Sequence, residues 1–153
     1  RHLPNSQLVD GFDSLRTLNR QVPVTLSANR GETEELATSG GGSVSGDSML
    51  DLATAARDIV GVDTVVSHGA RASAMTSEDD QALVETLHID EPEVVTSSGD
   101  HFNAGVCLGL LKGFDAAATT ALGNAVAGVF IRTGRSPTLP EVQTFLEEYA
   151  EQV

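Results

Sequence analysis

The first half of the chain alternates helical and extended patterns, and this alternation limits the possible folds more than any other feature of the sequence. Residues 11–20 suit a short helix, and residues 22–27 form an apolar, β-branched run that is typical of a strand. From Ser48 onward apolar residues recur at helical spacing, Gly61 suits the end of that helix, and residues 63–67 suit the next strand. Strands that alternate with helices predict an α/β layer structure with a largely parallel sheet.

The second half is predicted to begin with short strands and to continue as helices. Strands are expected near residues 72–76 and 83–87, on either side of the polar tip SEDDQ. Asp115 is a residue type that caps a helix start, and Thr138 with Glu141 has the spacing of a capping box. Helices are therefore expected at residues 99–112, 115–133 and from Thr138 onward, the last with an apolar face of Val142, Phe145, Leu146 and Tyr149.

The charge balance excludes some classes of partner. Nine Lys and Arg residues stand against 22 Asp and Glu residues, the net charge is −13, and Lys112 is the only lysine. Such a surface repels nucleic acid and anionic membranes, and it suits a protein kept soluble in a high-salt (halophilic) cytoplasm or an ordinary acidic cytosolic protein. The apolar runs are shorter than the roughly 18 residues that a membrane span needs. We therefore expect a cytoplasmic protein with no nucleic-acid or membrane partner.

Cysteine and histidine predict neither a disulfide framework nor a zinc site. Cys107 is the only cysteine, and its apolar helical surroundings predict a buried structural thiol. The spacing of the four histidines matches no zinc template; they are His2, His68, His88 and His101.

Residues 96–105, with the sequence TSSGDHFNAG, contain the strongest candidate for chemistry. If a helix starts near Gly99, the backbone N–H groups of residues 97–100 lie at its positive end, where an anion can bind. Asp100 would then lie beside a bound phosphoryl group and could accept a proton from an attacking hydroxyl. Two simpler interpretations stay open: Asp100 only caps its helix, and His101 is a half-exposed residue of the first turn that does not contact phosphate.

The same stretch resembles the C-terminal signature of the ribokinase-like kinases, also called the PfkB carbohydrate kinases. That signature is Asp-Thr-x-Gly-Ala-Gly-Asp-x-Phe-x-Ala-Gly, and the chain has VVTSSGDHFNAG in the same register. In the family the aspartate is the catalytic base and the small residues before it form an anion hole. The resemblance implies these roles for Asp100 and for the backbone of Ser97, Ser98 and Gly99.

Further motifs of the family occur in the same order, so that the resemblance covers about residues 20–153. ANRGE resembles the Asn-x-x-Glu motif after a strand and implies that Glu32 binds Mg²⁺ through water, although a solvated acidic helix start explains it too. VVSHGARA resembles the Thr-x-Gly-x-x-Gly turn, for which a plain hairpin is the structural alternative. LGNAV resembles the small-residue helix near the adenine, for which a capping or packing role of Asn124 is the structural alternative. The implied nucleotide-binding residues are Asn29, Ser67, Gly69, Arg71 and Asn124.

The chain departs from the family pattern at three places. Val94 and Val95 replace the Asp-Thr pair whose aspartate commonly helps to bind an activating monovalent cation, which puts potassium dependence in doubt. Ser97 and Ser98 replace Gly-Ala, a change that keeps the backbone donors if their dihedral angles fit. Ala72 replaces the last glycine of the turn.

The resemblance implies an ATP-dependent carbohydrate kinase with a ribokinase-like three-layer sandwich. It would use ATP and Mg²⁺ to transfer the γ-phosphoryl group to a hydroxyl of a small sugar, sugar acid or nucleoside. The alternative is a non-catalytic nucleotide-binding or regulatory member of the same fold, suggested by the altered VVTSSGD segment and by Ala72.

Residues 1–153 resemble only the C-terminal, nucleotide-binding and catalytic portion of such a kinase. We expect the N-terminal portion with the lid and most acceptor-binding residues to be absent from this chain, so that the fragment alone can be inactive. In the complete site Asn29, Gly69 and Asp100 should lie at one sheet edge, where ligands of open α/β sheets bind. The sequence leaves open whether the protein forms a homodimer.

Overall fold

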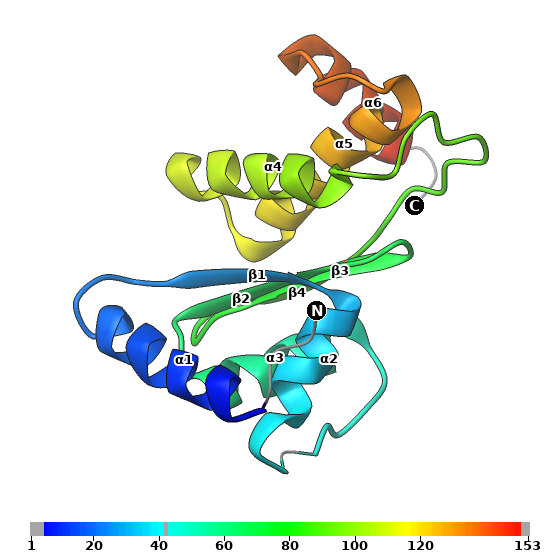
Figure 1. Cartoon of the computed structure of the whole chain (residues 1–153). Helices are drawn as coiled ribbons and strands as arrows, with labels where there is room; N and C mark the ends of the chain where they lie inside the picture. Colours follow the sequence, from blue (N-terminus) through cyan, green and yellow to red (C-terminus); the bar gives the residue numbers. More distant parts are fainter. Residues whose placement is uncertain (1–4, 42, 151–153) are drawn as a thin grey trace. The chain divides into compact units, whose positions relative to one another are not determined.

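The computed structural model describes residues 5–41 and 43–150, which form an α/β structure (Figure 1). These residues divide into two compact units. The first unit contains the chain up to Gly69 together with Ala74–Leu83, and the second contains Ala70–Ser73 together with the chain from Val84 onward. No helix in the described part of the chain is both long and apolar enough to cross a membrane.

The first half of the chain forms helices and strands in the predicted alternation. The elements are α1 (Asn5–Asn19), β1 (Thr25–Asn29), α2 (Arg30–Thr38), the 3-10 helix η1 (Ser39–Gly41), α3 (Met49–Val60), β2 (Thr64–His68), β3 (Ala72–Thr76) and β4 (Gln81–Glu85).

Helix α3 shows how local sequence determines an element of the first unit. The Ser48 hydroxyl accepts a hydrogen bond from the Asp51 amide at 3.1 Å, and the Asp51 carboxylate accepts one from the Ser48 amide at 3.1 Å. At the other end Gly61 has φ 75°, a left-handed conformation that favours glycine. Both predicted ends of this helix are confirmed. Between them the helix buries Met49, Leu52, Ala53, Ala56 and Val60.

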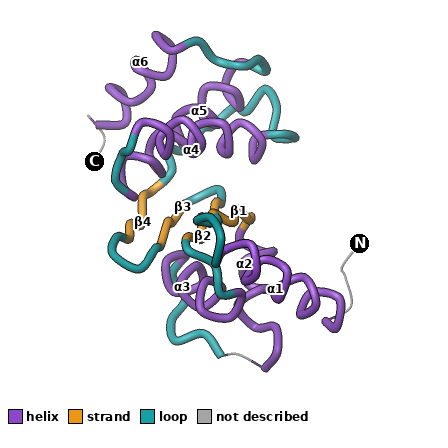
Figure 2. The backbone as a smooth tube through the Cα atoms, turned by 90° about the vertical axis from the view of Figure 1, so that its left-hand side faces the viewer, coloured by secondary structure: helices purple, strands orange, loops and turns teal. Residues whose placement is uncertain are grey.

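The four strands form one sheet in the order β1-β2-β3-β4. β1 and β2 are parallel, with Asn29 opposite His68 at their carboxyl ends, and β2 and β3 are antiparallel. The sheet is therefore mixed and partly parallel, and the predicted α/β class is confirmed. Figures 1 and 2 show α1, α2 and α3 together on one face of this sheet. The core on this face contains Phe12, Ala37, Met49, Ala53, Ala56, Val60, Val62, Val65 and Ala74.

The first strand begins later than residues 22–27, the range that the apolar pattern predicts. Val22 is 52% exposed, and Pro23 has no N–H to donate. The Val24 amide donates to the Asn19 side chain at 2.9 Å instead of to a neighbouring strand. The Val24 carbonyl accepts the Thr64 amide of β2 at 3.1 Å, and paired residues of the two strands begin at Thr25.

The second unit is mainly helical. Helices α4 and α5 approach each other closely enough for their backbones to touch, because a Cβ atom added to Gly105 would lie 2.7 Å from both the Gly123 Cα and the Leu122 carbonyl oxygen. A Cβ atom on Gly128 would collide with the Phe145 ring of α6. The three helices are α4 (Ser98–Lys112), α5 (Ala116–Thr133) and α6 (Leu139–Ala150), close to the predicted ranges.

The prediction of a buried thiol at Cys107 is wrong, because this cysteine is exposed. Gly105, Val106 and Gly109 are the buried residues of this part of α4, and Gly105 and Gly109 face α5. Cys107 lies about 200° around the helix from Gly105, at about 100° for each residue. Since α4 is apolar on both sides, its sequence pattern did not indicate which side packs.

Candidate active site

The Asn-x-x-Glu motif lies where β1 ends and α2 begins, and it forms a capping box. The Asn29 side-chain oxygen accepts the Glu32 amide at 3.0 Å, and the Glu32 Oε2 atom accepts the Asn29 amide at 2.9 Å. Both residues are exposed. These contacts agree with the structural alternative, in which Glu32 is an exposed acidic residue at the start of a helix. The box occupies Oε2 and leaves the Glu32 Oε1 atom without a hydrogen bond in the described part of the chain, which is compatible with a water-mediated metal contact.

The end of β2 lies beside this helix start. His68 is the parallel-strand partner of Asn29, and it is partly buried. Burial lowers the pKa of His68, and the negative charge of Glu32 acts in the opposite direction. Among the predicted nucleotide-binding residues, the first unit thus brings Asn29, Ser67 of β2 and Gly69, which follows β2, to the carboxyl ends of two adjacent parallel strands, where ligands of α/β sheets bind.

Ser67 uses its hydroxyl inside the first unit. The residue is fully buried, and its Oγ lies 2.7 Å from the Thr33 Oγ1 and 2.9 Å from the Met49 sulfur. Thr33 in turn donates to the Asn29 carbonyl at 2.8 Å. These contacts connect α2 to β2 and so position the strand ends that carry Asn29 and Gly69.

Helix α4 begins in an unusual conformation. Ser97 has φ 67° and ψ 10°, and it is the only residue other than glycine with positive φ among residues 5–41 and 43–150. This left-handed conformation costs an L-amino acid about 1–2 kcal/mol. Ser97 occupies the place of a glycine in the family signature, and its side chain forms no cap hydrogen bond.

The start of α4 also has backbone donors that protein groups do not use. Within the described residues, the amides of Gly99 and Asp100 have no hydrogen-bond partner, and Ser98 forms only a long bond of 3.3 Å to the Val95 carbonyl. Asp100 itself is exposed in the first turn. Uncapped amides at the positive end of a 15-residue helix favour an anion such as a phosphate.

His101, the residue after Asp100, has contacts that sequence analysis did not predict. One ring nitrogen lies 2.9 Å from the Ser97 carbonyl oxygen and the other lies 3.0 Å from the Ser136 hydroxyl. The ring stacks on Phe130 with the centroids 3.6 Å apart. Ser136 is 35 residues away in the chain, so no local pattern could have indicated this contact.

The other predicted nucleotide-binding residues of the second unit are Arg71 and Asn124. Arg71 is exposed, and its carbonyl accepts the Thr86 amide at 2.9 Å. Asn124 is buried on α5, where it accepts the Ser73 hydroxyl at 2.7 Å and lies 3.5 Å from the Glu85 carbonyl. These contacts agree with the structural alternative, in which Asn124 is a buried packing residue. Binding of adenine by Asn124 stays a prediction.

The described residues contain no cluster of three or more His, Cys, Asp or Glu side chains that could hold a metal by themselves. Mg²⁺ usually binds one or two carboxylates together with waters and substrate phosphates, so a single glutamate such as Glu32 fits this ion. The predicted site residues Asn29, Glu32, Ser67 and Gly69 belong to the first unit, and Arg71, Asp100 and Asn124 to the second. One combined site stays a prediction.

Solved structures identify the class of fold. The chain is similar to a ribokinase from Thermotoga maritima, with a TM-score of 0.64, 21% identity, and coverage of 80% of this chain and 42% of the other. It is also similar to a putative ribokinase II from Escherichia coli in complex with ATP and Mg²⁺, with a TM-score of 0.65, 19% identity, and coverage of 96% and 47%. The fold is therefore that of the ribokinase-like carbohydrate kinases, as predicted.

The family can be stated more narrowly. The model of the prokaryotic ketohexokinase family matches residues 1–149, and the chain belongs to this family. A ketohexokinase from Haloferax volcanii is 39% identical over 139 residues, which are 91% of this chain. The chain spans only 36% of the length of that relative.

Proposed function

We propose that this chain is the C-terminal nucleotide-binding and catalytic portion of an ATP-dependent sugar kinase. The observation that carries the proposal is the start of α4, where Asp100 is exposed and the amides of Gly99 and Asp100 have no partner among the described residues. Family membership supports the same conclusion. Because the chain spans 36% of its Haloferax relative, we infer that the acceptor-binding and lid portion lies in other residues of the complete kinase.

In this proposal Asp100 is the general base. Its carboxylate would accept the proton of the acceptor hydroxyl as that oxygen attacks the γ-phosphorus of ATP, the bond from this phosphorus to the β–γ bridging oxygen would break, and ADP would leave. The backbone of Ser97, Ser98 and Gly99 forms the anion hole that stabilises the negative charge on the transferred group. The dipole of α4 adds to this stabilisation, because the helix N-terminus is positive.

The first unit contributes the metal and nucleotide contacts. Glu32 would hold Mg²⁺ through water, because the capping box uses only one of its two carboxylate oxygens, and the ion would neutralise negative charge on the phosphates. Asn29 holds Glu32 in position through that box, and the turn after β2 lies against the nucleotide. ATP and Mg²⁺ as the cofactors are supported by the Escherichia coli neighbour, whose structure contains both.

The acceptor in this proposal is a ketohexose. The support is the name of the Haloferax relative, ketohexokinase, together with the family model that matches the chain. The sequence by itself left a sugar acid or a nucleoside equally open. A panel of acceptors therefore has to contain all three classes.

The second candidate is a non-catalytic nucleotide-binding member of the family. Val94 and Val95 favour it, because they replace the polar pair of the signature. Asp100 opposes it, because a protein that only binds nucleotide needs no base.

Two measurements on the full-length protein test the proposal. ATP with Mg²⁺ should raise its melting temperature, since a ligand that binds only the native state stabilises that state. ADP formation should then depend on a ketohexose in the acceptor panel. Binding of ATP without turnover on any sugar, sugar acid or nucleoside would establish the non-catalytic alternative, and the absence of any nucleotide effect at millimolar concentration would contradict both.

A further inference from the structure

His101 has a contact on each polar edge of its ring and on one face. Nδ1 lies 2.9 Å from the Ser97 carbonyl oxygen, and Nε2 lies 3.0 Å from the Ser136 hydroxyl. The face of the ring stacks on Phe130 of α5 with an angle of 12° between the two planes. A side chain with three such contacts has little rotational freedom, although it is only partly buried.

The chemistry of the partners determines the direction of both hydrogen bonds. A carbonyl oxygen can only accept, so Nδ1 carries a proton and donates it to Ser97. In the neutral imidazole Nε2 then accepts the Ser136 hydroxyl proton, and in the imidazolium Nε2 donates to the same hydroxyl, which can also accept. The bond to Ser97 is therefore compatible with either charge state of the ring.

The Ser97 carbonyl belongs to the strained residue at the start of α4. It accepts two bonds from His101, one from the ring and one of 3.3 Å from the backbone amide. A serine in the left-handed conformation would lower its free energy by returning to negative φ. That change would rotate the peptide between Ser97 and Ser98. Rotation of this peptide would break the ring contact and redirect the amides that follow.

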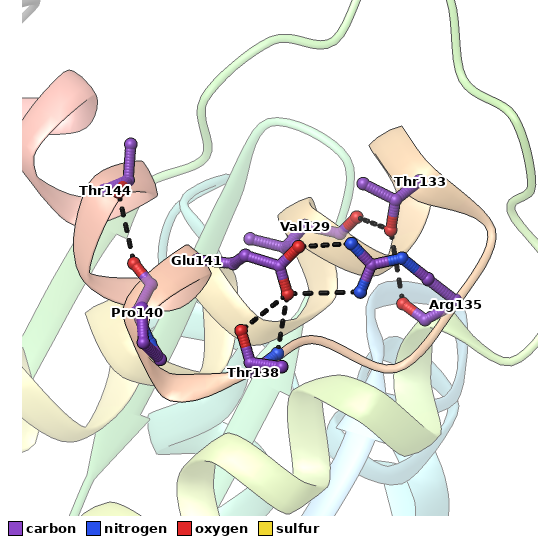
Figure 3. A network of polar contacts seen from close by, with 7 residues as sticks. All are labelled: Val129, Thr133, Arg135, Thr138, Pro140, Glu141 and Thr144. Atoms are coloured by element: carbon purple, nitrogen blue, oxygen red, sulfur yellow. Dashed lines mark hydrogen bonds and ion pairs between the residues drawn. The ribbon is translucent and has the colours of Figure 1, made fainter.

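The far partner of the ring lies in the connection between α5 and α6, which contains several polar contacts. Arg135 forms an ion pair with Glu141, and Glu141 accepts both the amide and the hydroxyl of Thr138 at 2.8 and 2.7 Å (Figure 3). The Thr133 hydroxyl donates to the Val129 carbonyl at 2.8 Å and lies 3.3 Å from the Arg135 carbonyl. Ser136 lies within this connection, so the ring of His101 has a fixed support on its Nε2 side.

We propose that His101 is a positioning residue of the phosphoryl-transfer site: its ring keeps the Ser97–Ser98 peptide in the left-handed geometry that directs the amides of Ser98 and Gly99 at the transferred phosphoryl group. The proposal rests on the proposed function. It assigns His101 no contact with substrate and no proton transfer. Serine can thus replace the signature glycine at position 97 because a histidine four residues later holds its carbonyl.

The test uses His101→Phe in the full-length protein, because phenylalanine can still stack on Phe130 but has no ring N–H. The turnover number should fall about 10- to 100-fold, the range that misplacement by about 1 Å produces, while the KM for ATP changes less than about threefold. His101→Asn, which returns a donor near the Nδ1 position, should recover part of the loss. His88→Phe is the matched control, because His88 is an exposed histidine that contacts Asp90 on the surface.

A double-mutant cycle with Ser97→Gly separates positioning from general stability. Glycine adopts positive φ without strain, so the effect of His101→Phe on turnover should be at least about threefold smaller in the Ser97→Gly background. Equal effects in the two backgrounds, or full turnover in His101→Phe, would overturn the inference.

A measurement without turnover distinguishes failure of the inference from failure of the proposed function. The NMR chemical shifts of Ser97 and of the amides of Ser98 and Gly99 report the local conformation whether or not the protein is a kinase. They should change in His101→Phe and stay unchanged in His88→Phe. Unchanged shifts in His101→Phe would refute the positioning role, whereas changed shifts in a protein that phosphorylates no acceptor would refute only the proposed function.

Discussion

Helices α2 and α4 begin in opposite ways, although the resemblance to the family predicts that both starts belong to the active site. At α2 the side chains of Asn29 and Glu32 satisfy each other's backbone amides. At α4 the N-cap residue, Ser97, has a left-handed backbone and its side chain caps no amide, and the amides of Gly99 and Asp100 have no partner in the described chain. Side chains therefore cap the first start, whereas the second start leaves two backbone amides available to a ligand.

The difference shows how a helix start that only stabilises the fold can be distinguished from one that can bind a ligand. Every α-helix begins with amides that lack an intrahelical partner. Where neighbouring side chains cap these amides, as at α2, little positive charge is left for a ligand, and a carboxylate such as Glu32 can act only through its remaining oxygen. Where backbone strain replaces the cap, as at Ser97, the amides stay available. The predictions below test this contrast, beginning with the largest expected effect.

The strongest test changes the carboxylate at the uncapped start. Asp100→Asn should lower turnover about 10²- to 10⁴-fold, because an amide cannot accept the acceptor proton, while ATP affinity stays near normal. Steady-state kinetics together with ATP titration of the full-length protein measure both. Normal turnover would remove Asp100 from the mechanism, and an unfolded variant would assign its carboxylate a role in folding instead.

Glu32→Gln tests whether the capped start also binds metal. Glutamine preserves the capping box, so the free energy of unfolding should change by less than about 0.5 kcal/mol. The loss of negative charge should nevertheless raise the Mg²⁺ concentration for half-maximal turnover at least about tenfold. Magnesium titrations of the two proteins provide the comparison. An unchanged magnesium requirement would leave Glu32 as a structural residue alone.

Substitutions at the two N-caps should have different effects on stability. Asn29→Ala should cost about 1 kcal/mol, because it removes a cap hydrogen bond. Ser97→Ala should cost close to nothing, because the Ser97 side chain caps no amide. Ser97→Gly should stabilise by about 0.5 kcal/mol, since relief of about 1–2 kcal/mol of strain exceeds the added entropy of the unfolded chain. Urea unfolding would measure all three, and an equal loss for both alanine variants would contradict the contrast.

Helix α6 provides a capped start with a measurable dependence on pH. Hydrogen bonds from Arg135 and from Thr138 lower the pKa of Glu141 from 4.5 to about 2. Because the folded pKa is the lower one, the ionised carboxylate stabilises the fold fully above about pH 4.5, and this contribution disappears as the pH falls toward 2. The decrease in melting temperature from pH 5 to pH 2.5 should therefore be smaller for Glu141→Gln than for the wild type.

Glu147→Gln is the control for that comparison, because Glu147 lies on the same helix and contacts only the neighbouring Gln143 side chain among the described residues. It should follow the wild-type curve. If the melting temperature of Glu141→Gln depended on pH as the wild type does, the ion pair with Arg135 would not contribute to the stability of the fold.

Cap residues made some elements predictable, and their absence explains where the expectations failed. Ser48, Gly61 and Asp115 are specific to helix ends, and the structure places helix ends at all three. The strand predicted at residues 22–27 contains no such residue, and its apolar pattern did not indicate where pairing with β2 begins. Cys107 was misassigned for a related reason, since both sides of α4 are apolar and a periodic pattern needs a polar side for contrast.

The candidate site was predictable only in so far as it is local in sequence. The signature identified Asp100 at a helix start and the capped pair Asn29 and Glu32. It could not indicate that Ser97 adopts a glycine-like conformation, because serine is uncommon there. Nor could it indicate the contact between His101 and Ser136, which depends on how α4 and α5 pack.

The contact between Gly105 and Gly123 has a mechanical consequence for Asp100. Where two helices meet through side chains, rotamer changes can absorb a small slide or roll of one helix over the other. Here backbone meets backbone, and no flexible atoms lie between them at this point. Asp100 is five residues from this contact on a continuous helix, so the start of α4 cannot move closer to α5 at this point without moving the backbone of α5 as well.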